Sequence, residues 1–299
     1  MRIGFGLPQF GPAAEAAEQT MRFAAGLEER GAASLWAGDR LLAAVDPRVG
    51  YGGGPGSGGR GIPRRMRAAH DPLALLTAAA AVTSRVQLGT STLNAPWYPA
   101  ALLARQATTV DRISGGRLLL GLGTGWSPEE YDAVGVPMSE RGDRLDECLD
   151  VFRTWWHDDP VRLDGKFATI APSHVQVKPH GIPVYLAGVA PRAQRRIAER
   201  ADGFLPVIVP GVTEPHDAVT VPWERLRVLA REAGRDPGAL GAALRVNPRT
   251  GQTVEDVVAT LRRVRAETGI EHAFVDLMYL ADDPDTLLQL ATRILDAVA

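Results

Sequence analysis

The chain alternates, from one end to the other, between apolar runs of strand length and longer segments with helical periodicity. Several runs, such as residues 33–37 and 117–122, are apolar nearly throughout, as strands buried on both faces of a parallel sheet tend to be. Eight such strand–helix units in 299 residues predict one α/β domain, residues 1–299, whose strands close into a (β/α)8 TIM barrel.

The boundaries of these units follow from the periodicity. The expected strands are residues 2–7, 33–37, 86–89 continuing into 90–93, 117–122, 183–187, 203–209, 240–246 and 273–278. The expected helices are residues 13–30, 72–83, 100–113, 143–156, 192–201, 222–233, 254–267 and 284–298. The sequence shows no linker and no internal repeat beyond this strand–helix period.

Two segments interrupt the alternation. Residues 38–71 follow the second strand and contain the tract GYGGGPGSGGRGIP. This glycine-rich loop is either a disordered surface loop or a mobile lid, because loops after barrel strands lie on the catalytic face. Residues 161–180 alternate polar and apolar side chains around Asp164-Gly165, which indicates a β-hairpin excursion before strand five.

Charge and composition restrict the partners. A net charge of −2 gives no electrostatic reason to expect nucleic acid or an anionic membrane surface. The single cysteine, Cys148, cannot form an internal disulfide, which favours a cytosolic enzyme. Pro8 interrupts the N-terminal segment too soon for a signal peptide, and no apolar run approaches the roughly 20 residues of a membrane helix. We expect a soluble cytoplasmic protein that acts on a small molecule.

Several catalytic motifs are absent from the sequence. It contains no HExxH, no paired CxxC and no GxxxxGK[ST]. The six histidines, at positions 70, 157, 174, 180, 216 and 272, lack ligand spacing, so we expect no metal site. Ser91 does not lie in a GxSxG elbow, which argues against a hydrolase.

The stretch GLGTGW, residues 121–126, looks at first like a dinucleotide-binding turn. Its glycines form GxGxG instead of GxGxxG, and Pro128 and the segment 135–137 interrupt the helix that a Rossmann unit needs. In a barrel the same glycines lie where strand four ends on the catalytic face, where a flat ligand can approach the backbone. The alternative is a tight strand–helix turn without a ligand.

In four places the chain resembles the bacterial luciferase-like monooxygenase family, specifically its deazaflavin-dependent branch, which uses coenzyme F420. The matching stretches are SLWAGDRLL (34–42), LGTSTLNAPWYPAALLARQATTVDRISGGRLLLGLGTGW (88–126), ERGDRLDE (140–147) and PVYLAGVAPRAQRRIAERADGF (183–204). They occur in the order and spacing of that family from strand two to strand six, whereas the last third matches only in its general pattern.

The resemblance implies roles for residues after strands two and three. Ser91-Thr92 occupies the place where deazaflavin-dependent members have a non-prolyl cis peptide bond under the central ring, and Asn94 belongs to the same cofactor-binding segment. Asp39 matches an acidic position near that ring. Arg40 stands where several relatives have histidine, and arginine suits anion binding or charge stabilisation better than proton transfer.

Resemblance also places Thr124, Gly125, Trp126 and Glu129 in the ring or substrate pocket. Trp126 replaces the glutamate that sugar-phosphate dehydrogenase relatives carry after GxGTG, so the substrate of those relatives is not assumed for this chain.

The phosphate of the cofactor is expected at Gly188, Val189 and Ala190. By similarity this segment opens the helix of residues 192–201, where free backbone N–H groups and the helix dipole form an anion site. Alternatively the segment is only a loop and a helix start.

FMN is the rival cofactor. Flavin-dependent members of the fold often place an arginine just after strand four, where this chain has its glycine-threonine turn, and this favours F420. Arg141 is a candidate phosphate partner in either case, or else a surface charge that caps the helix near Asp143.

We therefore expect an F420-dependent oxidoreductase that transfers a hydride between deazaflavin C5 and a C=C, C=N, C=O or alcohol substrate. Asp39, Arg40 and Trp126 are the residues expected beside the reacting centre. One alternative is an FMN-dependent monooxygenase that uses O2 and reduced flavin from a separate reductase. Another is a non-catalytic flavin- or deazaflavin-binding barrel, which the arginine at position 40 favours. Resemblance also implies a homodimer.

Overall fold

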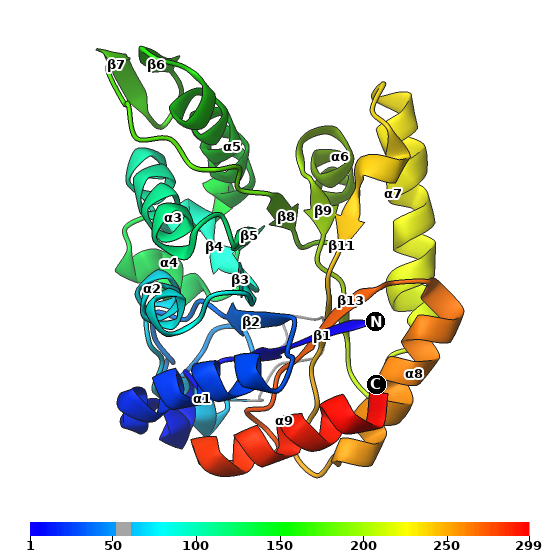
Figure 1. Ribbon diagram of the computed structural model, residues 1–299. Helices are drawn as coiled ribbons and strands as arrows, with labels where there is room; N and C mark the ends of the chain where they lie inside the picture. The colour runs from blue at the N-terminus through cyan, green and yellow to red at the C-terminus, as the bar shows by residue number, and fades with distance from the viewer. Residues whose placement is uncertain (52–60, 299) are drawn as a thin grey trace.

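The computed structural model of the protein describes residues 1–51 and 61–298. Its centre is a mostly parallel sheet with helices on the outer side (Figure 1). Neighbouring strands in the sheet are, in order, β10 (Val207–Ile208), β12 (Leu244–Val246), β13 (His272–Val275), β1 (Arg2–Gly6), β2 (Ser34–Ala37), β3 (Gln87–Thr90), β5 (Leu118–Gly123), β8 (Val184–Leu186), β9 (Gly203–Phe204) and β11 (Gly241–Ala242). β4 (Leu93–Asn94) adds a second pairing to β5.

The strands at the two ends of this order come from the same two segments of the chain. β9 and β10 are separated only by Leu205 and Pro206, and β11 and β12 only by Ala243. Backbone hydrogen bonds cross both interruptions, from Ala243 N–H to the Phe204 carbonyl and from Arg245 N–H to the Pro206 carbonyl. β11 pairs with β9, and β12 pairs with β10. The same two chain segments, residues 203–208 and 241–246, therefore pair at both ends of the order.

Helices follow most strands at the positions that the periodicity predicts. They are α1 (Ala17–Glu29), α2 (Pro72–Val82), α3 (Ala100–Ser114), α5 (Arg141–His157), α6 (Pro191–Arg200), α7 (Val221–Glu232), α8 (Val254–Thr268) and α9 (Pro284–Val298). Local signals fix their ends: Thr253 and Asp256 form a capping box on α8, and Gly269 ends that helix with a φ of +66°.

A different helical turn precedes the first and the sixth of the predicted helices. A 3-10 helix, Gly11–Ala16, precedes α1, and a π-helical turn, His216–Thr220, precedes α7. α4 (Pro128–Ala133) is a helix that the sequence reading did not predict. The remaining short 3-10 helices are Arg64–Arg67, Ala95–Trp97, Met138–Glu140 and Pro237–Ala239.

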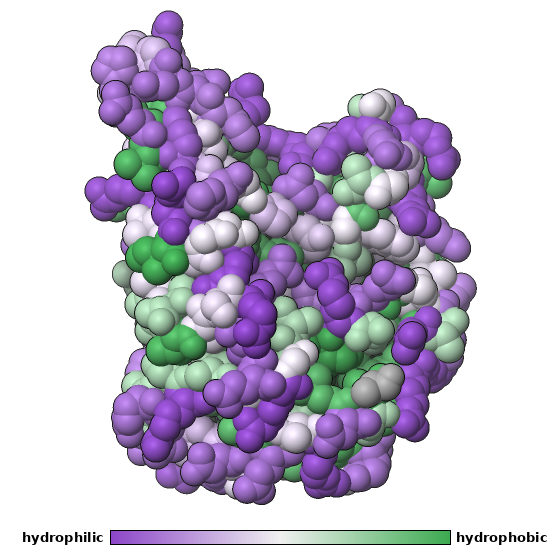
Figure 2. All heavy atoms as spheres, viewed as in Figure 1, coloured by the Kyte–Doolittle hydropathy of each residue, from purple (hydrophilic) through white to green (hydrophobic). Residues whose placement is uncertain are grey.

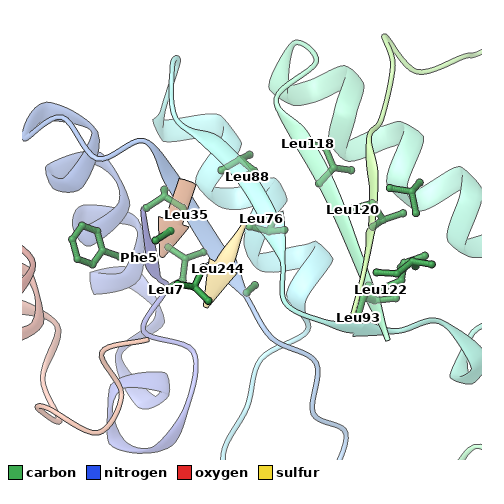
Figure 3. Packing of buried hydrophobic residues seen from close by; sticks show 14 of the residues in the cluster. Phe5, Leu7, Leu35, Leu76, Leu88, Leu93, Leu118, Leu120, Leu122 and Leu244 are labelled. Carbon is green, nitrogen blue, oxygen red and sulfur yellow. The ribbon is translucent and has the colours of Figure 1, made fainter. Parts of the chain in front are cut away.

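Two apolar layers fill the space on either side of the sheet. Alternate residues of β5, Leu118, Leu120 and Leu122, belong to the large cluster between the sheet and the helices (Figure 3). Leu119 points the other way, into a smaller cluster with Trp36, Leu205, Ala243 and Phe274. This second cluster lies on the face of the sheet that is turned away from the helices.

The predicted hairpin excursion is present. β6 (Val161–Asp164) and β7 (Thr169–Ser173) are antiparallel, and Asp164 pairs with Thr169 across a four-residue loop. The hairpin stands beside the end of α5 at the upper left of Figure 1, and this part of the surface is mostly hydrophilic (Figure 2). Glu147 of α5 holds the loop by accepting the backbone N–H groups of Lys166 and Phe167.

The glycine-rich tract lies mostly outside the described residues, because residues 52–60 belong to it. The flanking parts of the loop contact the barrel: Ala69 forms a bridge with Phe10, and Arg65 donates to the Met278 carbonyl. Within residues 1–51 and 61–298, no helix has the length and apolar character required to cross a membrane.

Candidate active site

A cavity of about 320 Å³ opens where the strands of the sheet end. Its wall comprises residues 38–40 after β2, residues 91, 92 and 94 after β3, residues 123–126 at the end of β5 and residues 187–188 after β8, together with Phe10, Tyr51, Met66, Glu130 and Arg245. The predicted site residues in this wall are Asp39, Arg40, Ser91, Thr92, Asn94, Thr124, Gly125, Trp126 and Gly188. The fold therefore brings together segments that lie far apart in the sequence.

Asp39 is half-buried in the wall. Its Oδ2 accepts the backbone N–H of Asn94 (2.9 Å) and the hydroxyl of Tyr98 (3.2 Å). Burial raises the pKa of Asp39 to about 7, and the two hydrogen bonds offset only part of that rise. Burial and, secondly, the Asp39 charge raise the pKa of Tyr98, so its hydroxyl remains a donor. Asp39 can thus hold or release a proton near neutral pH.

Arg40 places a buried positive charge beside an aromatic ring. Its side chain is only 5% exposed, and its guanidinium carbon lies 4.9 Å from the centroid of Trp126. Glu130 Oε1 is 3.6 Å from Arg40 Nε and accepts the backbone N–H groups of Leu41 and Leu42. Burial raises the pKa of Glu130, although the Arg40 charge lowers it in part.

Ser91 and Thr92 are joined by a cis peptide bond, as the resemblance implies. Arg245 contacts this segment: its Nη1 donates to the Ser91 carbonyl (3.3 Å) and its Nη2 to Asp276 Oδ2 (2.5 Å). Thr90 ties the preceding strand to β5, because its hydroxyl donates to the Gly121 carbonyl and accepts the Gly121 N–H. The wall under residues 91–92 is therefore held from two sides.

The glycines at the end of β5 permit close packing of the wall itself. A Cβ on Gly123 would lie 2.5 Å from Thr92 Oγ1. Gly125 has a φ of +63°, and a Cβ there would lie 3.2 Å from Asn94 Oδ1. The sequence reading assigned this freedom to an approaching ligand, whereas the structure uses it first to bring β5 against residues 92–94.

Glu129 lies outside the cavity wall, which corrects the expectation that it lines the pocket. Its carboxylate accepts the backbone N–H (2.8 Å) and Nε–H (3.0 Å) of Arg48 and the hydroxyl of Ser127. Burial acts to raise the pKa of Glu129, but these hydrogen bonds bring it to about 2. The predicted break at Pro128 is also wrong, because proline fits the first turn of a helix, and α4 turns Glu130 to the cavity in place of Glu129.

Arg141 also lies outside the wall. It begins α5, and its Nη1 donates to the Met138 carbonyl (2.9 Å) in the preceding turn. This contact matches the alternative reading of Arg141 as a charge at the helix start.

In the segment after β8, Gly188 lines the cavity, whereas Val189 and Ala190 do not. Gly188 lines the cavity with a φ of +138°, and a Cβ there would lie 2.7 Å from the Ala193 Cβ. Val189 and Ala190 are exposed, and Ala190 is the N-cap of α6. The cavity and the start of α6 are therefore adjacent, and the first-turn N–H groups of the helix lie beside its rim.

The sequence reading missed four residues near the reacting groups: Tyr98, Glu130, Arg245 and Tyr51, whose ring lies edge-on to Trp126 at 5.8 Å. Arg245 had a signal, because a charged side chain inside the apolar run of residues 240–246 is unusual for a buried strand. Tyr98, Glu130 and Tyr51 gave no such signal in the sequence, because their roles depend on contacts between distant segments. Within residues 1–51 and 61–298, no group of three or more His, Cys, Asp or Glu is placed to hold a metal ion.

Comparison with known proteins identifies relatives of this site and fold. A family model described as "Luciferase-like monooxygenase" matches residues 1–293. An F420-dependent glucose-6-phosphate dehydrogenase from Nocardia farcinica is 34% identical over 151 residues, which are 48% of this chain and 45% of that protein. Other curated relatives, 39% identical over 133 residues, are likewise covered over only 46% of their length.

Two solved structures share the fold. Monooxygenase RslO1 from Streptomyces bottropensis has a TM-score of 0.78 and 19% identity, covering 99% of this chain and 97% of that one. An F420-dependent secondary alcohol dehydrogenase, in complex with an F420-acetone adduct, has a TM-score of 0.77 and 17% identity, covering 100% and 99%. The match of the family model over nearly the whole length agrees with the resemblance that the sequence motifs indicate: the chain belongs to the luciferase-like monooxygenase family.

Proposed function

We propose that the protein is an F420-dependent oxidoreductase on a closed (β/α)8 barrel, and that it transfers a hydride between deazaflavin C5 and a small organic substrate. The observation that carries this proposal is the single cavity wall shared by Asp39, Ser91-Thr92 and Trp126. Membership of the family supports an oxidoreductase, and F420-dependent glucose-6-phosphate dehydrogenases among the relatives support the cofactor. The returning order of strand pairings supports the closed barrel.

The residues of the cavity fit a flat cofactor ring. The backbone of residues 91–94 forms one side, and residues 124–126 form another. Gly188 connects this space to the start of α6, where N–H groups without partners inside the helix would hold a phosphate. When bound, a reduced deazaflavin supplies a hydride to the substrate and becomes oxidised.

The side chains around the cavity supply what hydride transfer needs beyond the cofactor. Reduction of a C=O, C=N or C=C bond consumes one proton for each hydride, and the Asp39 carboxyl can give that proton because its pKa is about 7. In alcohol oxidation the Asp39 carboxylate would accept the proton instead. Arg40 stabilises negative charge beside the reacting bond, and Trp126 and Phe10 limit the access of water.

Cofactor titration tests the proposal directly. Purified protein is mixed with F420 or FMN, and the visible spectrum and retention on a desalting column are measured for each. We expect retention and a spectral shift with F420, followed by F420-coupled turnover of at least one compound in a panel of enones, imines, ketones and secondary alcohols. Retention of FMN alone would overturn the proposal and favour the monooxygenase, and F420 binding without turnover of any compound would favour a non-catalytic barrel.

A further inference from the structure

Two arginines line the same cavity, but their hydrogen bonding differs. Both Nη atoms of Arg245 have acceptors, the Ser91 carbonyl and Asp276. Arg40 Nε and Nη2 are buried and have no hydrogen-bond partner among the residues that the structure describes. Among the cavity-lining residues that the structure describes, Arg40 is therefore the one with fully buried side-chain donors that lack a partner.

The two unpartnered nitrogens form one edge of the guanidinium group. Nε–H and one N–H of Nη2 point in the same direction, and this edge matches the two oxygens of a carboxylate. The nearest acidic oxygen, Glu130 Oε1, is 3.6 Å from Nε and already accepts two backbone N–H groups. Trp126 lies over a face of the guanidinium, so the ring does not occupy this edge, and both nitrogens of the edge are buried.

Arg40 also lines a second cavity. Its volume is about 250 Å³, and it shares Arg40 and Met66 with the first cavity. Its other ionisable residues are Arg67, His70 and Glu15. Two arginines, Arg40 and the exposed Arg67, line this second cavity together with one acidic residue, Glu15, so its lining carries an excess of positive charge. An anionic group would be attracted toward Arg40 from this direction.

We propose that the substrate carries a carboxylate, and that Arg40 binds it through the Nε–Nη2 edge while the rest of the substrate occupies the first cavity beside Trp126. This inference rests on the proposed function, because that cavity is the one assigned to hydride transfer. A singly charged planar carboxylate fits better than a doubly charged phosphate, since Glu130 lies close to the same edge. Arg40 thus selects the substrate in place of a proton-transferring histidine.

Binding of simple acids to the protein without cofactor tests this inference. Calorimetry measures the affinity of acetate, benzoate and trans-cinnamate, of the methyl esters of the last two, and of inorganic phosphate. We expect at least one acid to bind ten-fold or more tightly than its ester, and more tightly than phosphate. Equal affinity for acid and ester across the panel, or a preference for phosphate, would contradict the proposal without any variant.

Two variants then locate the preference. Arg40→Lys keeps the charge but loses the two-nitrogen edge, so the ratio of acid to ester affinity should fall at least five-fold. Arg153→Lys, the same change at an exposed position on α5, should leave the ratio unchanged. An unchanged ratio in a folded Arg40→Lys protein would overturn the assignment to Arg40.

The same samples distinguish this inference from the proposed function. F420 is titrated into each protein and followed by its visible spectrum. F420 binding with no preference for acids would remove only the carboxylate assignment. A preference for acids in a protein that fails to bind F420 would remove the proposed function and leave the Arg40 site standing.

Discussion

Polar side chains are buried at both ends of the barrel interior, but the hydrogen bonding of Arg40 at one end differs from that of Ser34, Trp36 and His272 at the other. At the end where the strands begin, Ser34 Oγ lies 2.8 Å from His272 Nε2 and accepts the indole N–H of Trp36 at 2.8 Å. At the end where the strands finish, Arg40 keeps two buried nitrogens without partners among the described residues. An unpaired buried donor is costly, and in our proposal the ligand supplies the missing partner of Arg40, whereas Ser34, Trp36 and His272 satisfy one another within the protein.

A layer of apolar side chains separates these two ends. Trp36 and Phe274 stack with ring centroids 4.1 Å apart, and Leu119, Leu205 and Ala243 complete the layer. The cavity that we propose as the active site lies at the end formed by the loops after the strands, which is where barrel enzymes place it. The predictions below test this division, beginning with the largest expected effect.

Asp39→Asn should lower kcat at least about 100-fold on any substrate that turns over, because the amide cannot transfer the proton. In the direction of reduction, wild-type kcat should fall as pH rises through about 7, since the protonated carboxyl is the active form. The variant should lose that limb of the profile. Asp46→Asn, an exposed change in the same loop, is the control, and a similar loss there would show that the loop matters more than the proton.

Protonation of His272 should destabilise the end of the barrel where the strands begin. Burial lowers the pKa of His272 to about 4, from an ordinary value near 6.5. The unfolded chain therefore binds the proton first, and stability falls as pH decreases from 6.5 toward 4, by up to about 3 kcal/mol. Urea unfolding at several pH values measures this slope, and His272→Gln should flatten it. An equal slope in the variant would mean that other groups cause the loss.

Gly89→Ala should destabilise the apolar layer by about 1–3 kcal/mol. A Cβ at this position would lie 2.4 Å from Trp36 Cε3, and the stacked Phe274 and the bond to Ser34 prevent the indole from moving away. Gly61→Ala is the matched control, because a Cβ there meets open space. Thermal unfolding of both proteins measures the difference, and equal melting temperatures would argue against a tightly packed layer.

Glu130→Gln should have the smallest effect on the site, because the amide oxygen can still accept the N–H groups of Leu41 and Leu42. Removing the negative charge beside Arg40 should strengthen the binding of benzoate or cinnamate a few-fold in calorimetry. Weaker binding would indicate that Glu130 holds Arg40 in place. Arg40 would then depend on a partner within the protein, as Ser34, Trp36 and His272 do at the other end of the barrel.

The positions of strands and helices were predictable from local patterns. A strand that is buried on both faces, for example, is an apolar run, and such a run can be recognised without knowing its neighbours in the sheet. The expected strand of residues 117–122 and the observed Leu118–Gly123 differ by one residue at each end. Pro128 was misread because proline both interrupts helices and begins them, and only the following turn decides which. Glu129 and Glu130 could not be distinguished for the same reason, since the start of α4 sets which side chain turns toward the cavity.

Within the site, the family motifs located the segments, and the structure decided what each side chain does there. Asp39, Ser91-Thr92 and Trp126 share one cavity wall, and their roles toward a cofactor stay a prediction. Arg141 fits the same motifs but bonds to its own turn, because the direction of a side chain at a helix start depends on the packing of that turn.

By itself the sequence determined the alternation of strands and helices, the hairpin before the fifth strand and the family. These depend on local periodicity and on short motifs, which are readable one segment at a time. Only the tertiary structure decided that Arg40 lacks hydrogen-bond partners among the described residues while Arg245 has them, and that Tyr98 and Asn94 hold the Asp39 carboxyl. The reason is physical: burial and hydrogen bonding arise from residues distant in the chain, and they exist only once the barrel brings those residues together.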